Sequence, residues 1–213
     1  MTLLYYINYP SWLHPEVIPG FFVRWYAVMY LVGLGITYVL FMKLIRADKY
    51  SITKEVASDY IFYIMIGLIL GARIFSTLFY EIADTYRRAP WLIFWPFRNG
   101  QFTGFQGMSY HGGVVGGVTA ALIYTKIKKL DFLDLADYLC TALPLGYTFG
   151  RLGNFNLPRH PSQLYEAFFE GVFLWFIMWF ILRKIKPFKG FMLSMYLVLF
   201  GFFRFCVEYF RQP

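Results

Sequence analysis

The sequence predicts an all-α, polytopic integral membrane protein with about six transmembrane helices and interfacial arms. Of its 213 residues, 59% are hydrophobic and only 15% are charged, and the mean hydropathy is +0.50. Soluble domains carry about 25% charged residues. A helix needs roughly 20 mostly apolar residues to cross a hydrocarbon core of about 30 Å. Six segments approach that length and composition, namely 21–42, 60–80, 111–124, 132–149, 164–182 and 191–210.

Two further segments are predicted to lie on the membrane surface. Residues 1–20 form an N-terminal arm, because prolines interrupt any helix and the stretch lacks the features of a cleavable signal peptide. Residues 81–110 form an outer loop, because they are too polar and too rich in glycine to span, while their aromatic side chains suit the headgroup region. Since no long linker and no internal repeat divides the chain, residues 1–213 are expected to form a single transmembrane domain.

The third predicted span is short and rich in glycine. It contains Gly112, Gly113, Gly116 and Gly117. Small residues let neighbouring helices approach closely in a membrane, so we expect this helix to pack through backbone contact. The two cysteines, which fall inside later spans without a CxxC motif or a nearby histidine cluster, are expected to be packing residues, and no metal or cofactor is predicted.

Basic residues set the predicted topology. Lysine and arginine gather after the first, third and fifth spans, and such loops face the cytoplasm. Both termini and the remaining loops then face outward. The net charge of +8 is explained as an orientation signal in contact with anionic lipid. Nucleic-acid binding is not expected, because no basic stripe is interleaved with aromatic residues.

The polar run 150–166 lies between two strongly apolar segments. An ionisable side chain at membrane depth costs from about 2.5 to over 10 kcal/mol, so such residues usually have a function. Arg151 and Asn154 lie three residues apart, on one face of a helix end. The arginine fork suits a phosphate, and a phospholipid headgroup is the phosphate at this depth. A lone arginine would instead be expected to snorkel to the interface.

Other polar residues fall within or beside the spans. Arg204 lies inside the sixth span with Glu208 one turn later, so it either pairs only with Glu208 or faces a polar cavity. Glu166 and Glu170, one turn apart, either hold arginines in place or face a wet groove. Arg73 lies in surroundings too apolar for an ordinary surface charge.

Two aromatic side chains complete the candidate set. His111 opens the third span, where it could accept a proton from a nucleophile; the alternatives are a helix cap or a packing residue. Tyr26 shares a helix face with Tyr30, and its hydroxyl either reaches a headgroup or anchors the helix at the interface.

Five motifs together resemble the bacterial prolipoprotein diacylglyceryl transferase family. They occur in family order along nearly the whole chain: 25–30 (WYAVMY), 107–113 (GMSYHGG), 150–155 (GRLGNF), 159–166 (RHPSQLYE) and 208–213 (EYFRQP). The resemblance implies a transferase of the bacterial cytoplasmic (inner) membrane with its active site toward the outer face. Such an enzyme moves the diacylglyceryl group of phosphatidylglycerol onto the lipobox cysteine of a preprolipoprotein and releases glycerol 1-phosphate.

The resemblance also implies roles for the matching residues. Arg151 and Arg204 would hold and stabilise the phosphate, and His111 would be the candidate base. Asn154 would orient the headgroup, and Tyr26 and Glu208 would complete the pocket. Arg73 and Glu166 are further candidate substrate-binding residues because of their placement in the sequence, not because of the resemblance. The sequence does not indicate an oligomeric state.

The chain departs from the family pattern at three places. The long extracytoplasmic insertion that family members carry before the RHPSQ motif is absent, because residues 155–158 join the two motifs directly. Phe200 replaces a tyrosine one turn before Arg204. The sequence also stops at Pro213, where the family continues into a further transmembrane helix.

These departures leave two alternative functions open. A shortened relative could bind anionic phospholipid or a lipoprotein precursor without catalysis. Intramembrane charges alone would also permit a transporter or channel, although no internal repeat and no helix broken in mid-span supports that class.

Overall fold

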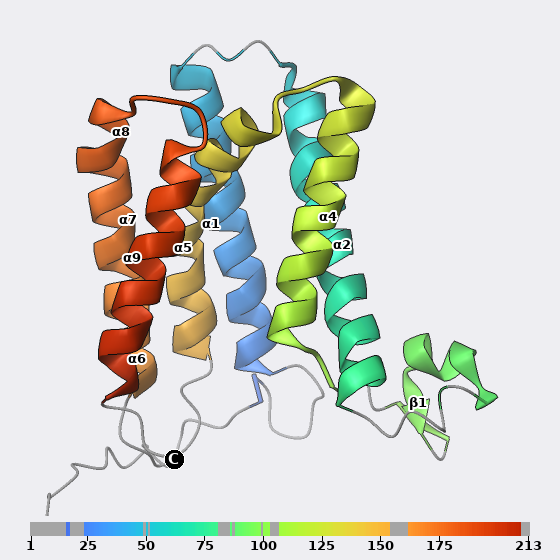
Figure 1. Cartoon of the computed structure of the whole chain (residues 1–213). Helices are drawn as coiled ribbons and strands as arrows, with labels where there is room; N and C mark the ends of the chain where they lie inside the picture. Colours follow the sequence, from blue (N-terminus) through green and yellow to red (C-terminus); the bar gives the residue numbers. More distant parts are fainter. Residues whose placement is uncertain are drawn as a thin grey trace, which may run out of the picture. The chain divides into compact units, whose positions relative to one another are not determined.

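The computed structural model describes residues 16–17, 24–48, 50, 52–80, 86, 88–98, 100–102, 107–153 and 162–209. Within these ranges the chain is almost entirely helical (Figure 1). It divides into two compact units, one formed by residues 1–51 and 133–213 and the other by residues 52–132. The expectation of a single domain stays a prediction.

All six predicted segments are helical within the described ranges. The helices are α1 (Trp25–Ala47), α2 (Lys54–Phe79), α4 (Tyr110–Lys128), α5 (Phe132–Gly153), a continuous helical segment Ser162–Ile185, and α9 (Phe191–Glu208). Four of them, α1, α2, Ser162–Ile185 and α9, are long and apolar enough to cross a membrane by length and composition. The chain is therefore a polytopic membrane protein, as predicted.

The helix boundaries differ from the predicted ones because polar residues extend the helices beyond the apolar stretches. Helix α2 begins at Lys54, six residues before the predicted start, since the hydroxyl of Thr53 caps it by accepting a hydrogen bond from the Val56 amide at 3.3 Å. Helix α4 likewise extends to Lys128, and the residue after it, Lys129, caps the helix in the left-handed conformation.

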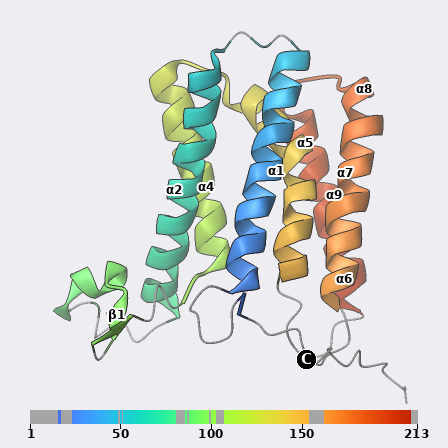
Figure 2. The ribbon, with the colours of Figure 1, turned by 180° about the vertical axis from the view of Figure 1, so that it is seen from behind.

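In the first unit, α1, α5, the segment Ser162–Ile185 and α9 lie side by side (Figures 1 and 2). Helices α1 and α5 approach through small residues. A Cβ atom on Gly33 would overlap the carbonyl oxygen of Gly146, and one on Gly153 would lie 2.6 Å from the Cβ of Met29. Cys140 is buried in α5 and Cys206 lies in α9, both as free thiols, as expected of packing residues.

The segment Ser162–Ile185 alternates between α-helical and π-helical turns. It consists of α6 (Ser162–Glu166), η2 (Ala167–Phe173), α7 (Leu174–Phe176), η3 (Ile177–Leu182) and α8 (Arg183–Ile185), of which η2 and η3 are π-helical. Wide turns of this kind are frequent at functional sites. The segment packs on α9 through a buried cluster of Leu174, Met178, Met192 and Phe203.

In the second unit, α2 packs against α4 through glycines. A Cβ atom on Gly112 or Gly116 would overlap the carbonyl oxygens of Gly71 and Gly67, respectively. The prediction of close packing by the third span is therefore confirmed at these two glycines, whereas Gly113 has only ordinary contacts. The predicted surface loop contains a short helical turn, η1 (Pro90–Phe94), and a two-stranded antiparallel ribbon of β1 (Phe97–Arg98) and β2 (Gln101–Phe102).

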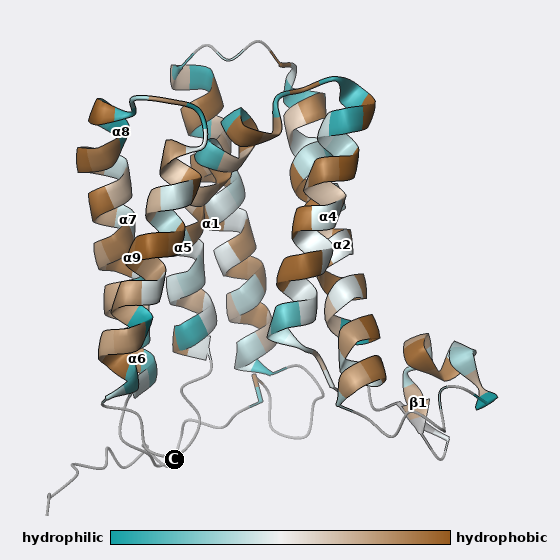
Figure 3. Ribbon diagram, viewed as in Figure 1, coloured by the Kyte–Doolittle hydropathy of each residue, from teal (hydrophilic) through white to brown (hydrophobic). Residues whose placement is uncertain are grey.

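The helices of the first unit have two chemically different ends. The arginine end is where α1 and α6 begin and where α5 and α9 finish. The lysine end is where α5 and α9 begin and where α1 and α8 finish. Figure 3 shows hydrophobic residues along the helix middles and hydrophilic residues toward both ends. The predicted N-terminal arm 1–20 lies outside the described residues except for Glu16 and Val17.

Candidate active site

Three helical elements bring charged side chains together at the arginine end of the first unit. Arg151 is in the last turn of α5, Glu166 ends α6, and Arg204 is in α9, one turn before Glu208. The tight contact of Gly171 in η2 against Thr148 in α5 lets these helices approach. Residues separated by more than 50 positions in the sequence therefore share one site.

Glu166 connects the two arginines. Its Oε2 lies 3.0 Å from Nε of Arg151, and its Oε1 lies 2.9 Å from Nη1 of Arg204. The Glu166 side chain is only 5% exposed, whereas the arginine side chains are 29% and 30% exposed. A single buried carboxylate thus fixes the positions of two partly exposed guanidinium groups.

Tyr147 and Glu170 support this arrangement from the buried side. The Tyr147 hydroxyl donates a hydrogen bond to Oε2 of Glu170 at 2.5 Å and accepts one from Nε of Arg151 at 2.6 Å. The guanidinium of Arg151 also lies over the Tyr147 ring, 4.9 Å from its centroid, in a cation–π contact. Glu170 is fully buried, and its Oε1 lies 3.7 Å from Nη1 of Arg204.

Arg204 contacts other acids besides Glu208, the acid one turn away. Its Nη2 lies 3.1 Å from Oε2 of Glu208, whose side chain is 54% exposed, while Nη1 contacts Glu166. The alternative in which Arg204 pairs only with Glu208 is therefore wrong. The alternative in which Glu166 holds the arginines in place is confirmed.

Both arginines keep hydrogen-bond donors for a ligand. A guanidinium carries five N–H donors. Among the described residues, the closest polar contacts of these guanidinium groups are made by Nε of Arg151 and by Nη1 and Nη2 of Arg204. The carboxylates therefore position the guanidinium groups without using all of their donors, and the exposed edges can bind an oxyanion.

Tyr26 reaches this site from α1. Gly153 of the GRLGNF motif lies against Tyr26, since a Cβ atom there would be 3.1 Å from the Tyr26 Cα. The rings of Tyr26 and Tyr30 pack together with their centroids 4.6 Å apart, and Tyr26 interacts electrostatically with Arg151. The motif glycine thus admits the helix that brings Tyr26 beside Arg151. Asn154, the remaining predicted residue of this motif, lies outside the described residues.

His111 belongs to the second unit. It is the second residue of α4, is exposed, and its ring contacts Tyr110 edge-on at 5.9 Å. The cap of α4 is Ser109, whose hydroxyl accepts a hydrogen bond from the Gly112 amide at 3.3 Å. The alternative in which His111 caps its helix is therefore wrong.

Arg73 also belongs to the second unit, where it is buried. Its Nε donates to the carbonyl of Ile93 at 2.6 Å and its Nη1 to the carbonyl of Gly107 at 3.2 Å. Its Nη2 donates to the Tyr86 hydroxyl at 3.2 Å. The guanidinium thus connects α2 to the segment that precedes α4, which is a structural contribution to the placement of the GMSYHGG motif.

Sequence reasoning missed Tyr147 and left Glu170 out of its candidate set. Tyr147 lies four residues before Arg151, the same one-turn spacing that drew attention to Glu166 and Glu170. A tyrosine in an aromatic-rich membrane helix has no distinguishing signal by itself. The spacing to an intramembrane arginine was the available signal.

The chain is similar in sequence to known proteins of one family. A family model described as "Prolipoprotein diacylglyceryl transferase" matches residues 16–213. Among similar proteins, a phosphatidylglycerol–prolipoprotein diacylglyceryl transferase of Treponema denticola is 46% identical over 277 residues, covering 99% of this chain and 81% of the relative. Its counterpart in Treponema pallidum is 39% identical (97% and 81%), and that of Chlorobaculum tepidum is 40% identical (96% and 80%).

The alignment lengths agree with the predicted absence of an insertion. The comparison with the Treponema denticola protein extends over 277 residues, whereas this chain has 213, so the relative contains residues without a counterpart here. The family match nevertheless covers the candidate residues of both units. The chain belongs to the prolipoprotein diacylglyceryl transferase family.

Proposed function

We propose that this protein transfers the diacylglyceryl group of phosphatidylglycerol to the lipobox cysteine of a preprolipoprotein, releasing glycerol 1-phosphate. The observation that carries the proposal is the pair Arg151 and Arg204, held by one buried carboxylate with donors left for an oxyanion. Family membership supports the same reaction, since the similar proteins carry both substrates in their names.

The reaction needs charge stabilisation more than any other contribution. The cysteine thiol loses its proton, and its sulfur forms a bond to the carbon of the diacylglyceryl group that carries the phosphate. The carbon–oxygen bond to the phosphate breaks, and the electron pair stays on the phosphate oxygen. Two guanidinium groups already in position stabilise that growing charge without reorganising. Arg151 and Arg204 are therefore the proposed catalytic residues.

The other residues of the site would act around Arg151 and Arg204. Glu166, Glu170, Tyr147 and Glu208 position the arginines through the contacts described. We further propose that Tyr26 and Asn154 contact the headgroup. A free thiol has a pKa of about 8.5, so a base or nearby positive charge must raise its thiolate fraction at neutral pH.

His111 remains the proposed base. It is an exposed side chain at the start of α4, in the motif that Arg73 helps to hold. A histidine near neutral pH can take up the thiol proton, and the arginines would raise the thiolate fraction further.

The proposed location is the bacterial cytoplasmic membrane with the arginine end on the outer face. The supporting observation is the distribution of basic residues in the first unit, because Lys43, Lys184, Lys186 and Lys189 all lie toward the lysine end. Positively charged loops stay in the cytoplasm.

The first test is mass spectrometry of a synthetic lipobox peptide incubated with the protein in phosphatidylglycerol liposomes. We expect a diacylglyceryl mass gain on the cysteine that disappears when the peptide carries serine instead. Arg151→Gln and Arg204→Gln should each lower the rate by about 10²-fold or more, the scale measured for lost oxyanion donors. Arg46→Gln is the control, because Arg46 is an exposed arginine in the last turn of α1.

The same assay separates the enzyme from a non-catalytic relative. A relative that only binds lipid would retain labelled phosphatidylglycerol but leave the peptide mass unchanged, although the protein is correctly folded. Its Arg151→Gln variant would lose the affinity for the lipid. That result would reject the transferase.

A further inference from the structure

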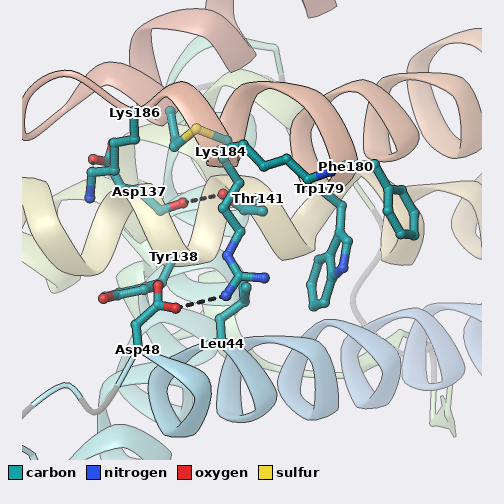
Figure 4. A pocket seen from close by; sticks show the side chains of 11 residues that line it. Leu44, Asp48, Asp137, Tyr138, Thr141, Trp179, Phe180, Lys184 and Lys186 are labelled. Carbon is teal, nitrogen blue, oxygen red and sulfur yellow. Dashed lines mark hydrogen bonds and ion pairs between the residues drawn. The ribbon is translucent and has the colours of Figure 1, made fainter.

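A cavity of about 400 Å³ opens at the lysine end of the first unit, away from the arginine site. Its walls come from the last turn of α1, the first half of α5, the turns η3 and α8, and the start of α9. Figure 4 shows polar and aromatic side chains from these elements pointing into the same space. The volume falls within the roughly 300–1,000 Å³ of typical ligand sites.

Buried polar contacts fix the walls of this cavity. Asp137 is 1% exposed, and its carboxylate accepts hydrogen bonds from the amides of Gly190 and Leu193, each at 2.9 Å. Its Oδ2 also lies 2.9 Å from Nζ of Lys186. The carboxylate therefore holds the start of α9 against α5. The ammonium of Lys186 offsets the charge of this carboxylate, so Asp137 and Lys186 together add no net negative charge to the cavity wall.

Positive charge is in excess around the cavity. Its lining includes three cationic side chains and two carboxylates. Arg183 is paired with Asp48 at 2.7 Å. Lys184, which is exposed, forms no ion pair with any residue in the described ranges. This lysine is therefore a cation available to a ligand.

A second available lysine lies on the tryptophan of the cavity wall. Nζ of Lys43 is 5.9 Å from the centroid of the Trp179 ring, and Cζ of Arg183 is 5.6 Å from that centroid. Lys43 likewise makes no ion pair within the part of the chain that is described. Trp179 thus contacts two cations near the end of a membrane helix, where indole rings favour the headgroup level.

An apolar surface continues from the cavity along the same helical segment. Phe180 lines the cavity and is 43% exposed, and Phe176 and Ile181 are 48% and 50% exposed. A ligand with an anionic head and hydrocarbon chains would match both surfaces. A soluble phosphate would use only the first.

We propose that this cavity is a second binding site, which takes the phosphate and glycerol backbone of an anionic phospholipid. Lys43 and Lys184 bind the phosphate, Trp179 packs against the glycerol backbone, and the acyl chains lie along Phe176, Phe180 and Ile181. The site is separate from the proposed catalytic arginines, which lie at the opposite ends of the same helices. Its existence does not depend on the proposed function.

Lipid binding to the full chain tests the proposal by native mass spectrometry in detergent. Phosphatidylglycerol is the probe, and zwitterionic phosphatidylcholine is the comparison lipid. The variant Lys43→Gln/Lys184→Gln should weaken one bound phosphatidylglycerol about 25-fold, because each basic residue near a membrane surface contributes roughly fivefold. The matched control is Lys126→Gln/Lys128→Gln, which removes the same charge from exposed positions in α4.

The two sites can be separated in the same experiment. Arg151→Gln should weaken a different bound lipid and slow peptide modification by about 10²-fold or more, whereas Lys43→Gln/Lys184→Gln should leave the modification rate unchanged. Failure of the transferase assay would therefore not affect this result. The proposal is rejected if both lysine double variants retain lipid equally, if phosphatidylcholine binds equally well, or if millimolar inorganic phosphate displaces the lipid.

Discussion

At the scale of single residues, Glu166 is the most informative side chain of the arginine site. It is nearly buried and contacts both guanidinium groups, one with each oxygen. Glu208 contacts Arg204 from a side chain that is 54% exposed. Exposed ion pairs contribute little, whereas small displacements of catalytic groups are costly.

The first prediction compares these two acids. Glu166→Gln keeps the shape but removes the charge that positions both arginines, so we expect the turnover number to fall about 10²-fold. Glu208→Gln should cause a clearly smaller loss. Peptide modification rates at saturating phosphatidylglycerol would measure both, and equal losses would contradict the positioning role of Glu166.

The second prediction concerns the hydroxyl of Tyr147. Tyr147→Phe removes the hydroxyl that donates a hydrogen bond to the buried Glu170 and accepts one from Arg151. Leaving such buried groups without this partner costs about 1–3 kcal/mol. We expect a roughly tenfold slower turnover. Phe200 packs edge-on against Tyr147 with ring centroids 5.4 Å apart. The double variant Tyr147→Phe/Phe200→Tyr returns a hydroxyl from this neighbouring ring and should recover part of the rate. An unchanged rate in Tyr147→Phe would refute this role.

At the scale of elements, the approach of α1 to α5 brings Tyr26 beside Arg151. Glycine makes that approach possible at Gly33, Gly146 and Gly153, where a larger side chain would collide with the facing helix. Another glycine of α1, Gly35, faces open space: apart from the neighbouring backbone of its own helix, no described heavy atom lies within 4 Å of where its Cβ would be. The chain therefore contains a matched pair of glycines two residues apart.

The third prediction uses this pair. Gly33→Ala places a methyl group on the carbonyl oxygen of Gly146 and should destabilise the protein by about 1–3 kcal/mol. Gly35→Ala should leave stability unchanged or raise it by up to about 1 kcal/mol, the usual gain in a helix interior. Thermal unfolding in detergent measures both, and similar melting temperatures would show that α1 and α5 do not depend on this contact.

The fourth prediction concerns the junction of α5 and α9. Asp137→Asn removes the negative charge of a carboxylate that accepts hydrogen bonds from two backbone amides and pairs with Lys186. We therefore expect the free energy of unfolding to fall by about 1.5–3 kcal/mol. Asp134→Asn is the comparison, since Asp134 pairs with Lys189 at 2.9 Å from a more exposed position. If Asp134→Asn is the more destabilising of the two, Asp137 is not the residue that anchors α9.

At the scale of the whole molecule, the proposed reaction requires that the arginine end face the outer side of the membrane. The fifth prediction places the arginine end outside. Tyr209 is 76% exposed just beyond α9, and Phe188 is 59% exposed in the turn between α8 and α9. In spheroplasts, a membrane-impermeant maleimide should label Tyr209→Cys directly and Phe188→Cys only after permeabilisation. The unmodified protein, with its two native cysteines, gives the background, and the reverse pattern would overturn the proposed topology.

The sequence predicted the helices well because their apolar length is a strong physical signal. It also selected Arg151, Glu166, Arg204 and Glu208, because charges are costly in apolar segments. Their mutual contacts were not predictable, since the pairing depends on how η2 and α9 meet α5. Tyr147 was missed because its importance comes only from its partners, Arg151 and Glu170.

The pairing of both arginines with carboxylates also affects which phosphates the enzyme admits. Two guanidinium groups face Glu166, Glu170 and Glu208, so the resting cluster has no surplus of positive charge. A dissolved phosphate ion therefore gains little by leaving water for this position. A lipid phosphate is different, because its hydrocarbon tails already keep it at the membrane. Selection would then rest on delivery by the bilayer, and free phosphate in the surrounding water would not block the site.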